Sequence, residues 1–117
     1  MIGEETAKLL WDAHGAVQRI DRFVAGRSFD DFLADDMLRA AVERQFEIIG
    51  ETFAGLRRID PTLAAAIPDL PRIVAFRNVL IHAYATVDPK LVWGVIENHL
   101  PALHATLAQL LGNAPEP

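Results

Sequence analysis

Apolar residues recur along this chain at intervals of three and four positions, the spacing that places them on one face of an α-helix. No segment alternates apolar and polar residues convincingly, as a half-buried β-strand would. The pattern therefore predicts an all-α protein.

Four long helices are expected, with short connections between them. They cover about residues 3–24, 35–56, 70 to 82 or 84, and 89–111. Gly26 is a plausible stop for the first helix, and Pro101 predicts a kink in the last. This order favours an antiparallel four-helix bundle with one or two short extra helices.

Polar residues in the connections mark helix starts. Ser28 and Asp31 have the spacing of a capping box, in which side chain and backbone bond reciprocally. Asp60-Pro61 and Asp88-Pro89 each place an N-cap acceptor before a first-turn proline, which predicts a short helix after residue 60. Gly50 interrupts the second long helix, so we expect a neighbouring helix or backbone to approach closely there.

Length and composition favour one soluble domain. The chain has 117 residues, of which 51% are hydrophobic and 23% charged, and it contains no cysteine. We expect a single helical domain over residues 1–111, a flexible tail over 112–117, no membrane span and a cytoplasmic location. The net charge of −5 argues against broad attachment to a phosphate backbone.

The stretch "FRNVLIHAYATVD", residues 76–88, concentrates polar chemistry in an otherwise apolar chain. On a helical projection Ile73, Phe76, Leu80 and Ala83 form the arc that should face the core. Arg77 lies near Tyr84, while Asn78 and His82 are one turn apart on the side away from the core.

That far side is itself apolar. It carries four apolar residues around the polar pair, namely Val74, Ala75, Val79 and Ile81. A small bundle cannot bury both sides of one helix, so the second side predicts a partner, most simply a twofold-related copy of the chain.

The residue types at this position suit cleavage of RNA without a metal. Histidine transfers protons near neutrality, and arginine is a permanent cation that stabilises charge developing on phosphate. When a ribose 2′-hydroxyl attacks the phosphate, His82 could remove or deliver a proton and Arg77 could neutralise the charge on the phosphate. Asn78 could orient the imidazole or bind the ribose. Spacing alone does not decide the matter, because an arginine and a histidine five apart also occur as ordinary surface residues.

The string "RNVLIHAY" resembles the Arg-x4-His-x-Tyr signature of the HEPN superfamily, and specifically its HepT-like toxin branch. "FLADDMLRAAVERQFEIIGE" is similar to the second-helix signature of that branch, and "VDPKLVWGVIENHLPAL" resembles its closing helix. The resemblance covers roughly residues 5–111 in order and without large insertions.

The resemblance implies a homodimeric helical bundle whose ribonuclease centre forms at the dimer interface. Arg77 and His82 of both subunits would be catalytic, and no metal or other cofactor is needed. It also implies a two-gene toxin-antitoxin module, in which an MntA-like nucleotidyltransferase inactivates the toxin by adding AMP to the motif tyrosine, here Tyr84. The substrate would be an RNA, either tRNA or mRNA.

Two features leave room for other interpretations. The chain has Arg72 where many relatives have Trp, and Ala83 where they have Glu, which puts substrate preference in doubt. Glu51, at a family-typical position, either supports Arg77 across the bundle or is a solvated carboxylate. A different class of function is also open, a non-catalytic helical binding module that partners a nucleotidyltransferase and presents a nucleotide or RNA groove.

Overall fold

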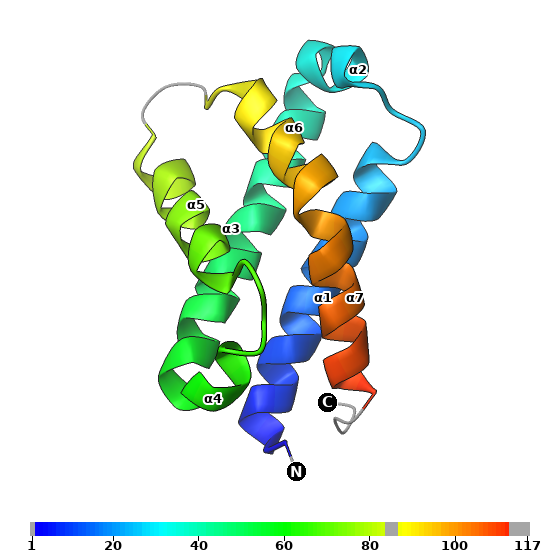
Figure 1. The fold of residues 1–117 in the computed structure, drawn as a ribbon. Coiled ribbons are helices and arrows are strands. Elements are labelled where there is room, and N and C mark those ends of the chain that lie inside the picture. The colour runs from blue at the N-terminus through cyan, green and yellow to red at the C-terminus, as the bar shows by residue number, and fades with distance from the viewer. Residues whose placement is uncertain (1, 84–86, 113–117) are drawn as a thin grey trace.

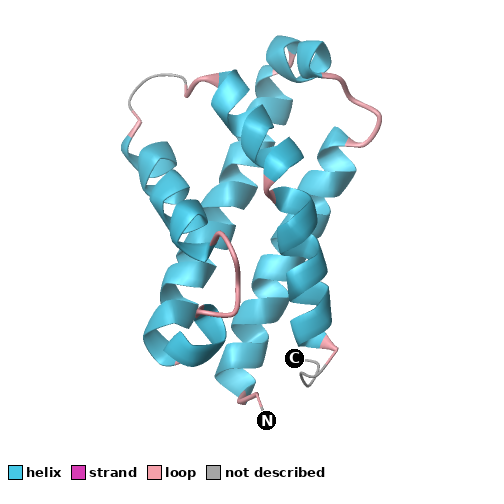
Figure 2. Cartoon of the chain, in the orientation of Figure 1, coloured by secondary structure: helices cyan, strands magenta, loops and turns pink. Residues whose placement is uncertain are grey.

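A computed structural model describes residues 2–83 and 87–112, and over these residues it contains helices and connections but no strand (Figure 2). The helices are α1 (Glu4–Val24), α2 (Phe29–Ala34), α3 (Asp36–Ile59), α4 (Pro61–Ala64), α5 (Leu70–His82), α6 (Pro89–Asn98) and α7 (Leu100–Leu111). The all-α prediction is therefore confirmed. In this part of the chain, none of the helices is both long and apolar enough to cross a membrane.

The expected helix starts and stops are present. At α2, Asp31 N–H donates to Ser28 Oγ at 3.1 Å, and Ser28 N–H donates to the Asp31 carboxylate at 2.9 Å, which completes the capping box. The hydrogen bond from the Ser28 backbone also lowers the pKa of Asp31. Asp60 caps α4, and Gly26 ends the first helix with a left-handed φ of 72°.

The last helix differs from its prediction. Instead of one kinked helix over residues 89–111, the chain leaves the helical conformation at His99, which separates α6 from α7. Pro101 is the physical reason, because it lacks the N–H that would bond to the Glu97 carbonyl and its ring clashes there. In the first turn of α7, by contrast, a missing N–H costs nothing.

The long helices pack side by side around one apolar core. α3 lies between α1 and α5, α7 runs along α1, and α6 leads from the α2 end of the molecule into α7 (Figure 1). The largest fully buried side chains come from every helix except α4 and α6: Leu10, Ile20, Phe32, Phe46, Ile49, Phe53, Leu56, Leu70, Ile73, Leu100, Leu103 and Leu107.

The two ends of the elongated molecule differ in what they carry. The start of α1 and the end of α7 lie at the end where α4 also lies (Figure 1). The C-terminal end of α5 lies at the opposite end, where α2 is found. This arrangement places His82, the last residue of α5, far from both ends of the described chain.

Candidate functional site

α5 carries the first part of the polar window, residues 76–82, and buries three of the four residues of the predicted arc. Ile73, Phe76 and Leu80 are all buried, and the Phe76 ring meets the Phe46 ring of α3 edge to face with centroids 5.2 Å apart. Ala83 lies just beyond the helix and is exposed, so it takes no part in the core.

The second side of α5 is apolar and mostly uncovered, with one correction. Val79 is 51% exposed and Ile81 43% exposed, and Ala75 is also exposed. Val74, predicted on the same side, is instead buried by its own chain. It belongs to the same apolar core cluster as Ile73 and Phe76.

Gly50 is what permits this approach, as its position in the sequence predicted. A Cβ atom at Gly50 would lie 2.7 Å from Arg77 Cγ and 3.2 Å from the Ile73 carbonyl oxygen, and closer still to Arg77 Cβ. α3 therefore contacts α5 at the residue that opens the polar window, which fixes the stem of the Arg77 side chain.

The head of Arg77 turns toward its neighbour on α5. Arg77 Nη1 donates a hydrogen bond to Asn78 Oδ1 at 3.0 Å. Asn78 and His82 are both exposed and one turn apart, so the guanidinium, the amide and the imidazole follow the same stretch of surface. Over the described residues, His82 has no hydrogen-bond or ion-pair partner.

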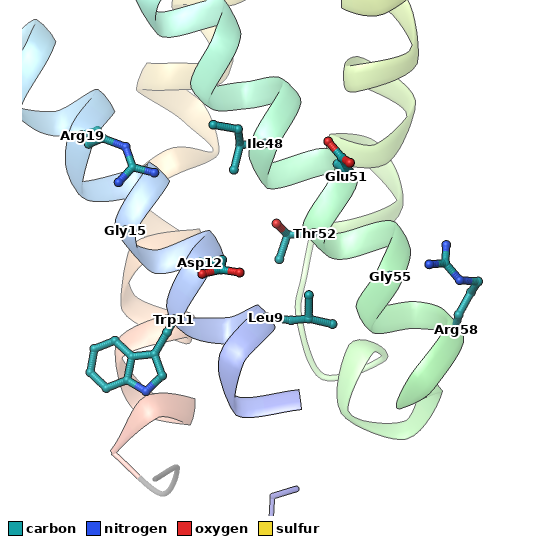
Figure 3. Close-up of a pocket in the computed structure, with 10 residues that line it drawn as sticks. All are labelled: Leu9, Trp11, Asp12, Gly15, Arg19, Ile48, Glu51, Thr52, Gly55 and Arg58. Atoms are coloured by element: carbon teal, nitrogen blue, oxygen red, sulfur yellow. The ribbon is translucent and has the colours of Figure 1, made fainter. Parts of the chain in front are cut away.

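The predicted supporting residue Glu51 lines a different part of the surface. No ion pair joins Glu51 to Arg77, although both belong to the described part of the chain. Glu51 lines a groove of about 540 Å³ between α1 and α3, together with charged residues such as Asp12, Arg19 and Arg58 (Figure 3). Tyr84 lies outside the described residues.

A polar link between α5 and the α6–α7 break was missed from the sequence. His99 Nδ1 lies 2.9 Å from Asp69 Oδ2, and Arg72 approaches both residues, with its Nε 3.8 Å from Asp69 Oδ1. Asp69 is the N-cap of α5 and adopts a left-handed φ of 67°. The link thus joins the start of the site helix to the end of α6, and no spacing in the sequence indicated it.

Two histidines, His14 of α1 and His104 of α7, lie next to each other. The His14 ring meets the His104 ring at 5.2 Å, and His104 Nδ1 lies 2.8 Å from the Asp21 carboxylate. Both His14 ring nitrogens are buried and lack a hydrogen-bond partner in the described chain. Burial lowers the pKa of His14, and the neighbouring His104 lowers it further. Among the described residues no group of three or more His, Asp or Glu side chains could hold a metal ion.

An all-helical domain with an arginine, an amide and a histidine along one helix is the arrangement expected for the HEPN class. The family model described as "Ribonuclease HepT-like" matches residues 13–110. The chain belongs to the HepT-like ribonuclease family.

Relatives from three organisms agree with this assignment. The chain is 32% identical over 103 residues to the "Probable ribonuclease HepT" of Thermococcus cleftensis, covering 86% of this chain and 91% of the relative. It is 29% identical over 105 residues to a candidate RNase of Methanocaldococcus jannaschii, covering 88% and 94%. A candidate RNase of Caldanaerobacter subterraneus is 33% identical over 88 residues, covering 75% and 78%. No solved structure matches the chain significantly.

Proposed function

We propose that this protein is a metal-independent endoribonuclease in which His82 transfers protons, Arg77 stabilises the phosphate and Asn78 orients the reacting groups. The observation that carries the proposal is the Arg77–Asn78 hydrogen bond beside an exposed His82, in a chain of the HepT-like ribonuclease family. An exposed imidazole that has no partner among the described residues is available to meet a substrate hydroxyl.

The reaction proposed is attack by the ribose 2′-hydroxyl on the neighbouring phosphorus. The 2′-oxygen loses its proton and forms a bond to phosphorus. The bond from phosphorus to the 5′-oxygen breaks, and a proton is delivered to the departing 5′-oxygen. Histidine can perform either proton transfer, and the Arg77 guanidinium neutralises the additional negative charge of the crowded phosphorane.

A homodimer fits this chemistry, because two copies of His82 could then serve as base and acid. It is supported by the exposed apolar side chain of Ile81, which directly precedes His82 on α5. In the proposal each subunit is one domain over residues 1–111, a four-helix bundle in which α6 and α7 form an interrupted fourth helix. Light scattering should show a dimer for the wild type and a monomer for Ile81→Asp; a monomeric wild type at micromolar concentration would contradict the shared site.

The cellular role proposed is that of a toxin acting in the cytoplasm on tRNA or mRNA, with an MntA-like nucleotidyltransferase as its antitoxin. AMP on Tyr84 would bring phosphate charge and bulk next to the proposed catalytic residues and exclude the substrate phosphate. The chain should be produced together with the product of its neighbouring gene and examined by mass spectrometry. If the neighbouring gene product relieves growth arrest but the chain keeps its unmodified mass, control by AMP addition is contradicted.

The catalytic assignment is tested by cleavage and growth-arrest assays on His82→Ala. The substitution should abolish cleavage, because it removes the proton-transfer group. It should leave the unfolding midpoint unchanged, because His82 is exposed. Gln109→Ala, an exposed change on α7, serves as the matched control and should retain both properties. If His82→Ala cleaves RNA as fast as the control, His82 is not the proton-transfer group.

The second candidate is a non-catalytic binding module that partners a nucleotidyltransferase and presents a groove for a nucleotide or RNA. It is favoured by the net charge of −5, which is unusual for a protein that must attract RNA. Purified wild-type protein that binds the nucleotidyltransferase but leaves RNA intact would favour this role over the nuclease.

A further inference from the structure

A groove between α5 and α6 borders the proposed site. Its volume is 460 Å³, within the range of about 300–1,000 Å³ found for small-ligand sites. The apolar part of its lining, called the floor below, consists of Ala75, Phe76 and Val79 of α5 and of Leu91 and Val95 of α6. The rim is polar and consists of Arg72, Lys90, Asn98 and His99.

The charge of this groove is opposite to that of the chain. The protein carries a net charge of −5, yet among the described residues no carboxylate lines the groove. Arg72 is partly offset by Asp69, but Lys90 is exposed and has no ion-pair partner in the described part of the chain. Glu97 of α6 does not line this groove but a neighbouring pocket, which includes Phe29 of α2 and shares Lys90 and Gly94 with the groove. The groove therefore offers local positive charge over an apolar surface.

The groove also points toward the proposed proton-transfer group. Arg72, Ala75 and Val79 line it and are spaced three and four residues apart, which places them in one row along α5. His82 follows Val79 by three residues and continues the same row at the end of the helix. A strand lying in the groove would thus run along α5 to the imidazole.

We propose that this groove binds a nucleotide of single-stranded RNA next to the cleaved bond, with the base on the apolar floor and the backbone phosphates on Lys90 and Arg72. The proposal rests on the ribonuclease function and adds the path by which substrate reaches His82. Bases bind to proteins through their faces, which an apolar floor accepts, and phosphates require only nearby cations.

Gly94 offers a test that should not unfold the protein. It lines the groove in the middle of α6, and an added Cβ would meet only Asn98 Nδ2, at 3.9 Å. Gly94→Leu therefore fills the groove while replacing a poor helix former with a good one. Gly15→Leu is the matched control, because Gly15 lies mid-helix in α1 with a single neighbour at 3.5 Å and lines the other groove.

The probe is a fluorescent single-stranded RNA of mixed sequence with 2′-O-methyl riboses, which cannot supply the attacking hydroxyl. Its affinity is measured by anisotropy over a range of salt concentrations. Gly94→Leu and Lys90→Ala should each weaken binding at least about threefold, and Lys90→Ala should reduce the slope of log affinity against log salt by about 0.7. Gly15→Leu and Arg44→Ala, an exposed cation of α3 outside the groove, should bind as the wild type does.

Binding is scored separately from cleavage, so the two proposals can fail independently. Loss of cleavage in His82→Ala together with unchanged probe binding by Gly94→Leu would overturn the groove but keep the nuclease. The groove could instead receive a second copy of the chain, and light scattering tests this alternative. If Gly94→Leu converts a dimer into a monomer, the second copy occupies the groove and the RNA proposal is wrong. Absence of probe binding by the wild type would overturn it as well.

Discussion

Gly50→Ala is expected to separate α3 from α5 at the proposed active site. The added methyl group would lie 2.7 Å from Arg77 Cγ and 3.2 Å from the Ile73 carbonyl oxygen, with Arg77 Cβ closer than either. Carbon atoms in contact prefer about 3.5–4.0 Å, so the helices must move apart by about 1 Å or more. Rotation of the Arg77 side chain gives no relief, because its Cβ is fixed to the backbone.

Two effects of opposite sign determine the stability of this variant. Alanine favours a helix over glycine by about 1 kcal/mol, whereas overpacking a close contact costs about 1–3 kcal/mol. Backbone-fixed atoms place the cost near the upper end, so the free energy of unfolding should fall by about 1–2 kcal/mol. Activity should fall further, because misplacing catalytic groups by about 1 Å can cost a factor of about 100 in rate.

Urea denaturation and an RNA cleavage assay measure the two effects. Gly55→Ala is the matched control in the same helix, since a Cβ there would meet its nearest neighbours at an ordinary 3.8 Å. This control should be as stable as the wild type or more so, and equally active. If Gly50→Ala matches the control in both measurements, the close approach of α3 does not position Arg77, and the reasoning is refuted.

Changes at three further positions test other parts of the structure. Protonation of His14 opposes folding because its pKa is lowered in the folded state, so stability should decline as pH falls below about 6.5. His14→Leu should flatten that decline in denaturation curves; an unchanged decline would assign it to other groups. Asp69→Asn should be tolerated, because asparagine accepts a left-handed φ and can still accept a hydrogen bond from His99, whereas Asp69→Ala should lower the free energy of unfolding by about 2 kcal/mol. Equal stabilities for the two variants would contradict this. Ser28→Ala should cost about 1 kcal/mol by thermal or urea denaturation through loss of the α2 cap, and no loss would mean that water replaces it.

Local signals carried most of the fold. Asp60 and Ser28 cap helices where the sequence placed them, and Ile73, Phe76 and Leu80 of the predicted α5 arc are buried, whereas Ala83 is not. The break at His99 could not be separated from a kink, because a proline in a helical pattern fits both outcomes.

The contacts between distant residues were harder to predict. Gly50 indicated a close approach, but no spacing within one helix could name Arg77 as the residue it meets. Likewise, Asp69 and His99 are 30 residues apart, and only the folded chain brings them together. The roles of Arg77, Asn78 and His82 stay predictions that the variants above can test.

The common position of the α1 start and the α7 end has a practical consequence. Both ends lie opposite the end of the molecule that carries His82 (Figure 1). Neighbouring chain ends on a surface tolerate insertion and permutation well. An affinity tag, a fluorophore or a tethered nucleotidyltransferase attached at either one would leave the His82 end open to incoming RNA, and a permuted chain could join the two ends through a short linker.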